Sequence, residues 1–117
     1  MLKLVDQLVA SSLLLVGGAH IAVASRVFGE PTEARIWFLS AGLMGLVTGL
    51  ANLARARSAR PERLASLTAL VGALAIVLTG VLLGLAGTAA ATRAPALAVF
   101  AIGGLAAAFS LRDLLRR

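Results

Sequence analysis

The chain has no cysteine and no tyrosine, and it contains a single histidine and a single tryptophan. The absence of cysteine excludes disulfide bonds and thiolate metal sites. One histidine without cysteine is too few ligands for a structural metal site, so we expect neither a metal nor another cofactor. No serine–histidine–acid set, phosphate-binding loop or deep pair of carboxylates is present, so we do not expect an enzyme.

Apolar residues are abundant instead. They make up 60% of the 117 residues, and the mean hydropathy is +0.98, whereas a soluble domain is usually about half apolar or less. A membrane-spanning helix needs about 20 mostly apolar residues, and four such stretches fit, at residues 4–28, 31–54, 61–86 and 95–115. We therefore predict an all-α fold in which residues 1–117 form one integral membrane domain, a four-helix bundle of two transmembrane hairpins.

Basic residues lie at the ends of these stretches and are distributed unequally. Eight lie on the side of the termini, namely Lys3, Arg55, Arg57, Arg60, Arg63, Arg112, Arg116 and Arg117, and three lie on the other side, namely Arg26, Arg35 and Arg93. Because cytoplasmic loops carry the excess of Lys and Arg, we predict that both termini are cytoplasmic. The net charge of +6 is then explained by topology and lipid headgroups, and no nucleic acid is expected as a partner.

The start of the chain has a second interpretation. Lys3, the apolar run and the small residues at 22–24 are also typical of a secretory signal peptide, although Asp6 interrupts the basic leader and the run is long for a signal. The high arginine and alanine content and the charge bias favour the bacterial inner membrane as the location.

Glycines recur along one face of the second stretch. Phe38, Gly42, Gly45, Gly49 and Asn52 follow at spacings of four, three, four and three, which places them on one side of a helix. Glycine weakens a helix by about 1 kcal/mol relative to alanine, and in a bilayer such small residues allow two helix backbones to approach closely. We predict that these five residues, together with Gly80, Gly84 and Gly103, form helix-packing faces. For Asn52, a bond between helices or a capped carbonyl is favoured over ligand binding.

The last stretch repeats this spacing at Ala96, Phe100, Gly103, Ala107 and Ser110. The parallel suggests a duplication of two helical hairpins. A shift of 62 residues pairs Phe38 with Phe100 and Gly42 with Gly104, although so apolar a composition makes chance matches common.

The single histidine lies on a similar face of the first stretch, with Ala10, Leu13, Gly17 and Ala24. Counted at 1.5 Å per residue from the helix end, His20 lies about 10 Å inside the membrane. A polar residue at this depth is a functional candidate, so His20 and Gly17 are candidate ligand-binding residues. The alternative is a neutral imidazole bonded to a neighbouring helix. A haem shared across a homodimer also stays open. Met44, a possible second haem ligand, lies at a similar depth, but it is about 200° around its helix from Gly42 and so faces away from the glycine face.

Charged residues cluster in the connection between the first two stretches, at Arg26, Glu30, Glu33 and Arg35. They are consistent with a solvated loop held by weak ion pairs. The sharper interpretation is a docking surface for an external partner.

The small multidrug resistance proteins are similar in size and in number of spans. That resemblance implies a carboxylate deep in the first helix, but every acid here lies at a helix end, and Asp6 is about one turn too shallow. The small DoxX-like membrane proteins are also similar in size and helix count. That resemblance is one of gross architecture alone, so neither family supplies a function.

Short connections and spans of near-minimal length leave little room for an independent site. We therefore expect a small accessory or structural subunit that packs through its Gly/Ala faces in a homo-oligomer or a larger membrane complex. The alternative is a membrane binding or transport protein for a hydrophobic small molecule, such as a lipid or quinone, with an outer-leaflet pocket at His20.

Overall fold

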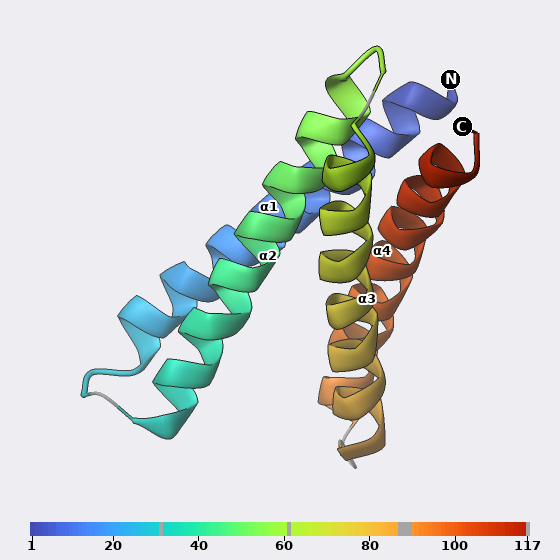
Figure 1. Ribbon diagram of the computed structural model, residues 1–117. Helices are drawn as coiled ribbons and strands as arrows, with labels where there is room; N and C mark the ends of the chain where they lie inside the picture. Colours follow the sequence, from blue (N-terminus) through green and yellow to red (C-terminus); the bar gives the residue numbers. More distant parts are fainter. Residues whose placement is uncertain (31, 61, 87–89, 117) are drawn as a thin grey trace.

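The computed structural model describes residues 1–30, 32–60, 62–86 and 90–116, with backbone alone for residues 33, 83, 86 and 90–93. Over these ranges the chain forms four helices and no strand (Figure 1). They are α1 (Leu2–Val27), α2 (Glu33–Arg57), α3 (Arg63–Ala86) and α4 (Ala90–Leu115). All four helices are long and apolar enough to cross a membrane. The predicted all-α fold with four potential spans is confirmed.

Two helix boundaries differ from the predicted spans by three residues or more. The prediction ends the second span at residue 54 and assigns Arg55 to the connection, whereas α2 continues to Arg57. The physical reason is that the Arg55 side chain turns into the protein and is held there by ion pairs. The prediction also opens the last span near Pro95, but α4 begins at Ala90 and Pro95 lies inside it. Proline is tolerated best in the first turn, so this position costs α4 one backbone hydrogen bond.

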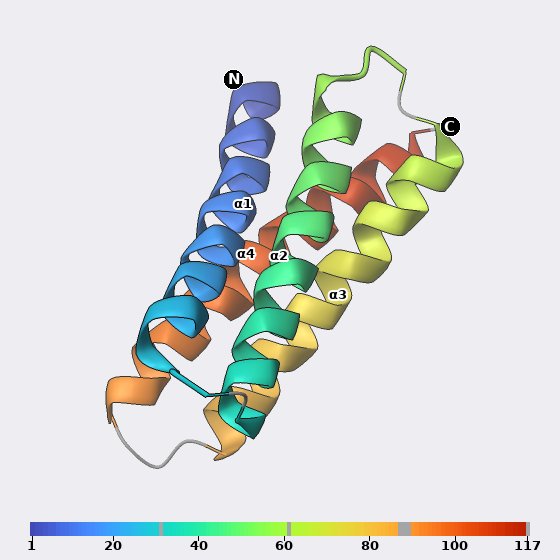
Figure 2. The same ribbon diagram turned by 90° about the vertical axis from the view of Figure 1, so that its left-hand side faces the viewer.

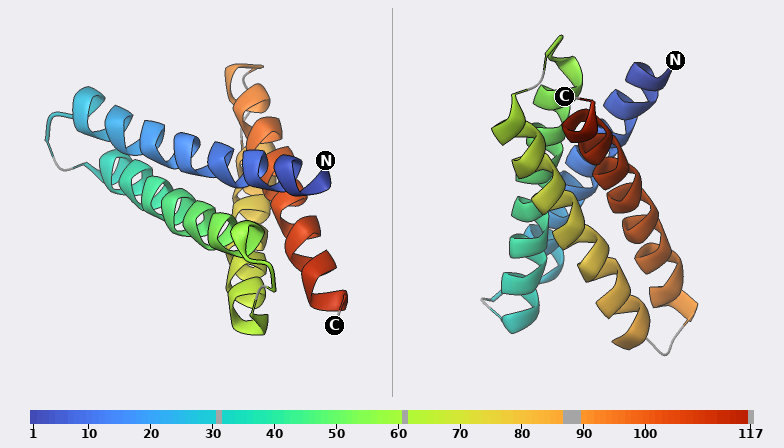
Figure 3. Two further views of the ribbon diagram at one scale, coloured as in Figure 1. Left: turned by 90° about the horizontal axis from the view of Figure 1, so that it is seen from above. Right: turned by 45° about the vertical axis from the view of Figure 1, so that its right-hand side comes forward.

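The helices are arranged as two antiparallel pairs, α1 with α2 and α3 with α4 (Figures 1 and 2). Both termini and the α2–α3 connection lie at one end of the molecule, which we call the termini end. From there the two pairs diverge toward the other end, which we call the open end (Figure 3). The pairs therefore meet mainly over the half of the molecule nearest the termini.

Glycine lets the backbones of α1 and α2 approach closely. A Cβ atom on Gly17 would lie 2.7 Å from the Leu46 nitrogen and 2.8 Å from the Gly42 oxygen. A Cβ on Gly45 would lie 3.0 Å from the Gly17 Cα, and one on Gly49 would lie 2.9 Å from the Leu14 nitrogen. Since atoms rarely approach this closely, a side chain at any of these positions would force the two helices apart.

The second pair uses fewer glycines. A Cβ on Gly80 would lie 2.9 Å from the Phe100 nitrogen, and one on Gly103 would lie 3.1 Å from the Val77 nitrogen. Gly84 has no atom of a described residue within 4 Å of its Cβ position, so its predicted helix packing is not seen against the described part of the chain. Gly104 is equally open. The shift of 62 residues therefore pairs a tightly packed glycine, Gly42, with an open one.

The contact between α2 and α3, one of those that join the two pairs, is formed by small and polar residues. A Cβ on Gly72 would lie 2.6 Å from the Thr48 hydroxyl oxygen, and the Asn52 side-chain nitrogen lies 3.4 Å from the Ala69 oxygen. An apolar core joins all four helices near these contacts, and it consists of Val9, Leu13, Ala73, Ile76, Ala106 and Ala107, flanked by Met44, Leu70, Val99, Ile102 and Phe109.

The surface around the bundle is strongly apolar. Leu15 is 75% exposed, Leu64 73% and Leu85 79%, and many further Leu, Val and Ile side chains point outward. Soluble monomers rarely expose contiguous apolar surface on this scale. The exposed side chains match a protein whose helix pairs face lipid.

Candidate functional site

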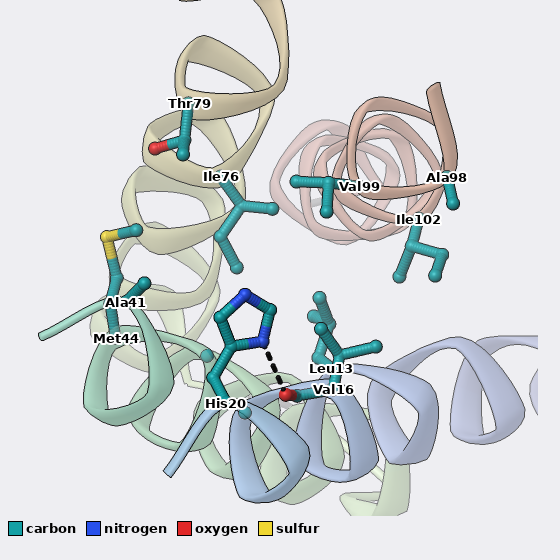
Figure 4. Close-up of a pocket in the computed structure, with 12 residues that line it drawn as sticks. Leu13, Val16, His20, Ala41, Met44, Ile76, Thr79, Ala98, Val99 and Ile102 are labelled. Atoms are coloured by element: carbon teal, nitrogen blue, oxygen red, sulfur yellow. Dashed lines mark hydrogen bonds between the residues drawn. The ribbon is translucent and has the colours of Figure 1, made fainter. Parts of the chain in front are cut away.

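A cavity lies just beyond the middle of the helices, on the side of the open end, and Figure 4 shows the residues that line it. Its volume is about 110 Å³. All four helices contribute to its wall, which is formed by Leu13, Val16, Gly17, His20, Ala41, Met44, Gly45, Ile76, Thr79, Ala98, Val99 and Ile102. Because almost all of these side chains are apolar, the cavity suits a hydrophobic occupant.

His20 is the one aromatic ring at the cavity wall. Its Nδ1 lies 2.9 Å from the Val16 carbonyl oxygen, one turn back in α1. Figure 4 shows the second ring nitrogen, Nε2, directed away from Val16 toward Ile76 and Val99 across the cavity. The imidazole also stacks on Phe38, with ring centroids 5.4 Å apart and an interplanar angle of 29°. The ring is thus held at both its face and one edge, while its other edge faces the cavity.

The residues beside His20 explain why there is space. Gly17 lies on the same face of α1, and Gly17 and Gly45 both line the cavity as well as the close α1–α2 contact. The predicted pair His20 and Gly17 therefore lies together at a cavity. Met44 lines it from α2, so the prediction that it faces away from the glycine face does not separate it from His20.

The alternative, in which His20 bonds to a neighbouring helix, is wrong. The imidazole bonds within its own helix, to Val16, and no other described residue bonds to it. Phe38, which was predicted to lie on a helix-packing face, contacts two rings of α1 and its C-cap, His20 and Phe28, with centroids 5.4 Å away in each case. It is 36% exposed at the surface.

A second cluster, of charged residues, lies at the termini end. The Arg55 side chain is fully buried, and its Nη2 lies 2.5 Å from Asp6 Oδ1. Its Nη1 donates to Asp6 Oδ2 at 3.1 Å and also to Asp113 of α4. Arg112 completes the cluster, with Nη2 2.9 Å from Asp113 Oδ1 and 3.4 Å from Asp6 Oδ2. We call these four residues the ionic cluster. Two arginines face two aspartates, so the formal charges of the cluster cancel.

Polar side chains connect the ionic cluster to the helices around it. Asn52 lies one turn before Arg55, and its Oδ1 is 3.4 Å from Arg55 Nη2 and 3.1 Å from the Ser110 hydroxyl. The Asn52 amide nitrogen donates to the Thr48 carbonyl at 3.0 Å. Asn52 thus bonds between helices, as expected. One buried atom of the cluster, Arg55 Nε, has no partner among the described residues.

The ionic cluster was not predicted from the sequence, because the four residues that form it were placed at helix ends or in a connection. Asp6 and Arg55 are only 2% and 1% exposed. A signal was present, however. The face that contains His20 reaches Asp6 when the spacing is continued by four residues from Ala10, and the face that ends at Asn52 reaches Arg55 by a further step of three. When the buried faces of two helices each continue, at helical spacing, to residues of opposite charge, the pattern indicates that the two residues form an ion pair.

In the connection between α1 and α2, the described side chains of Arg26, Glu30 and Arg35 form no ion pair with one another. Arg35 Nη1 donates to the Gly29 carbonyl at 3.0 Å, and the Arg35 backbone nitrogen donates to the Thr32 hydroxyl at 3.2 Å, which caps α2. Neither Arg26 nor Glu30 forms an ion pair with a described side chain. The Glu33 side chain is outside the described part of the chain. The expectation of weak ion pairs in this loop is therefore wrong for its described members.

The described residues contain no group of three or more His, Cys, Asp and Glu side chains placed to hold a metal ion. Comparison of the chain with models of protein families, with curated proteins and with solved structures gives no match.

Proposed function

We propose that this chain is a small integral membrane protein that binds a hydrophobic small molecule between its two helix pairs. The observation that carries the proposal is the apolar cavity of about 110 Å³ to which all four helices contribute and which one edge of the His20 ring faces. Such an arrangement, mostly apolar with very few polar groups, is typical of sites that bind small molecules.

The size of the cavity limits what it can hold. A buried apolar cavity of about 150 Å³ takes up a benzene molecule. The cavity beside His20 is somewhat smaller, but the helix pairs diverge from it toward the open end (Figure 1). We therefore propose that it holds a single ring or a short length of acyl chain, with the rest of a larger lipid or quinone lying between the pairs.

The charge distribution supports a location. Lys and Arg are in excess at the termini end, which favours a cytoplasmic position for both termini and an outer-leaflet position for the cavity. We propose the bacterial inner membrane as its location and the lipid bilayer as its immediate partner. We propose that the role is binding or transport without catalysis, because His20 and Thr79 are the only polar side chains among the described residues of the cavity wall.

Binding can be measured at Met44, because its side chain lines the cavity and the chain has only two methionines. The protein is labelled with ¹³C at the methionine methyl groups, reconstituted in nanodiscs and titrated with toluene. We expect a saturable shift of the Met44 methyl signal. Ala98→Leu, which fills the cavity mouth, should abolish the shift, whereas Ala108→Leu, on an exposed part of α4 outside the cavity, should keep it. A shift that rises linearly in all three proteins would show partition into lipid alone and would contradict the proposal.

A second candidate is an accessory subunit in a homo-oligomer or larger membrane complex. Three glycines support it, because Gly18, Gly84 and Gly104 have open space at their Cβ positions and could accept another helix. Close packing of helices at small residues is the usual mode of association in membranes. This candidate predicts an oligomer or a stoichiometric complex in mild detergent that Gly104→Leu disrupts. Recovery of the native chain only as a monodisperse monomer would argue against it.

A further inference from the structure

We infer that the cavity is selective for a neutral hydrophobic molecule that donates a hydrogen bond, such as a phenol or a hydroquinol, over a related ether, ketone or quinone. The inference rests on the proposed binding function and specifies its ligand class. It follows from which hydrogen-bonding groups the cavity wall has already used and which it leaves to a ligand.

The tautomer of His20 is determined by its bond within α1. The Val16 carbonyl can only accept a hydrogen bond, so His20 Nδ1, 2.9 Å away, must carry the proton. In a neutral imidazole the other nitrogen, Nε2, is then an acceptor with no proton. Because Nε2 is directed across the cavity (Figure 4), the ring offers a ligand one acceptor and no donor.

The other polar side chain of the wall offers no donor either. The Thr79 hydroxyl donates to the Ala75 carbonyl, 2.9 Å away in its own helix. Figure 4 shows its oxygen turned away from His20. The remaining side chains of the wall are aliphatic or that of Met44, and glycine supplies no side chain. A ligand whose only polar groups are acceptors would therefore find no side-chain partner here.

A charged donor is disfavoured for a separate reason. Among the described residues, the cavity wall contains no acidic side chain that could balance an ammonium group. The buried Asp6 and the part-buried Asp113 lie at the termini end and are engaged by Arg55. Since an unpaired charge is very costly in an apolar site, the donor must be neutral, and a hydroxyl group on an apolar ring meets both conditions.

This selectivity has a consequence for quinone-like molecules. The oxidised form has two carbonyl acceptors, whereas the reduced form carries two hydroxyl donors. Sites built to bond a hydroxyl group reject analogues that lack it, because their own polar atom is then left without a partner. The cavity would bind the reduced form of such a molecule in preference to the oxidised form.

Three probes that share a methyl-substituted benzene ring test the inference at about pH 8, where histidine is ordinarily neutral. They are p-cresol, which donates a hydrogen bond, 4-methylanisole, which only accepts one, and toluene, which does neither. Each is titrated into the native protein and into His20→Phe, with the Met44 methyl signal as the reporter. Phenylalanine keeps a ring beside Phe38 but removes the acceptor. Dividing the affinity ratios of the two proteins cancels the different partition of the probes into lipid.

We expect native protein to prefer p-cresol over 4-methylanisole by about two- to tenfold more than the variant does, as one neutral hydrogen bond would give. Equal ratios in both proteins, with saturable binding of all probes, would overturn the ligand class and leave the binding function intact. The absence of saturable binding for every probe would overturn the binding function itself.

A second measurement needs no variant and so does not depend on the folding of His20→Phe. Because His20 is the only histidine, ¹⁵N labelling of histidine gives one pair of ring signals. We expect Nδ1 to carry the proton and Nε2 to be bare, with the Nε2 signal shifting on addition of p-cresol and not of 4-methylanisole. A proton on Nε2 and not on Nδ1 would contradict the inference.

Discussion

At the scale of single residues, Arg55 has the largest side chain among the fully buried ones that the structure describes. Its guanidinium is buried together with Asp6 and meets Asp113 from the opposite helix pair. A buried ion pair gains little over apolar packing as a whole, but removal of one partner leaves a charge without compensation. Arg55 therefore stabilises the fold mainly because it compensates the negative charges of Asp6 and Asp113.

We predict that Arg55→Met lowers the free energy of unfolding by about 3–5 kcal/mol, because Asp6 loses its main partner in a buried position. Arg57→Met is the matched control. It removes the same group two residues later in α2, where the side chain is exposed, so a change within about 0.5 kcal/mol is expected. Unfolding of both variants in mild detergent with increasing SDS measures the difference. Equal stabilities would show that the ionic cluster does not hold the structure together.

From the sequence, the residues beside the cavity could be predicted, but those of the ionic cluster could not. His20 and Gly17 were expected to lie together at a possible pocket, because a polar residue among small residues at helical spacing is unusual deep in a membrane. Asp6 and Arg55 were assigned to solvated ends, because hydropathy alone places charged residues outside the span. Hydropathy cannot show that two opposite charges from different helices meet and can be buried as a pair.

At the scale of elements, the glycine face of α2 was evident from spacing, but its partner was not. The structure shows that Gly42, Gly45 and Gly49 lie against α1. Spacing identifies a face on one helix, whereas the identity of the opposing helix depends on the register of the pair. For the same reason, Gly84 was grouped with packed glycines although no atom of a described residue lies within 4 Å of its Cβ position.

Two adjacent glycines of α1 give a direct test of this packing. A Cβ on Gly17 would lie 2.7 Å from backbone of α2, whereas one on Gly18 would meet nothing within 4 Å. We predict that Gly17→Ala destabilises the protein by about 1–3 kcal/mol through overpacking. Gly18→Ala should instead stabilise it by up to about 1 kcal/mol, through its higher helix propensity.

The two variants differ by one position in the same helix, so each serves as the control for the other in SDS unfolding. Effects of the same sign and size would mean that backbone flexibility, and not the α1–α2 contact, explains the glycines.

At the scale of the whole molecule, the two helix pairs are joined unequally along their length. The ionic cluster and the bond between Asn52 and Ser110 lie at the termini end, and the pairs diverge toward the open end (Figure 3). Asp113 and Arg112 of α4 are the members of the ionic cluster that lie across from α1 and α2. Their ion pairs with Arg55 and Asp6 join the two helix pairs, and we call these ion pairs the tie. The cavity beside His20 lies nearer the open end, where the tie no longer constrains the helix pairs.

If the tie sets the angle between the pairs, weakening it should broaden the distance between their far ends. The chain has no cysteine, so Gly29→Cys and Leu97→Cys place two spin labels, one at the end of each pair remote from the termini. Pulsed electron paramagnetic resonance in nanodiscs then measures the distribution of distances between the labels. We expect Asp113→Asn to broaden this distribution, because Arg55 loses its charged partner on α4. Glu62→Gln, at an exposed acid with no ion pair to a described side chain, should leave it unchanged. An unchanged distribution in Asp113→Asn would mean that apolar packing alone fixes the angle, and that the cavity width is independent of the ionic cluster.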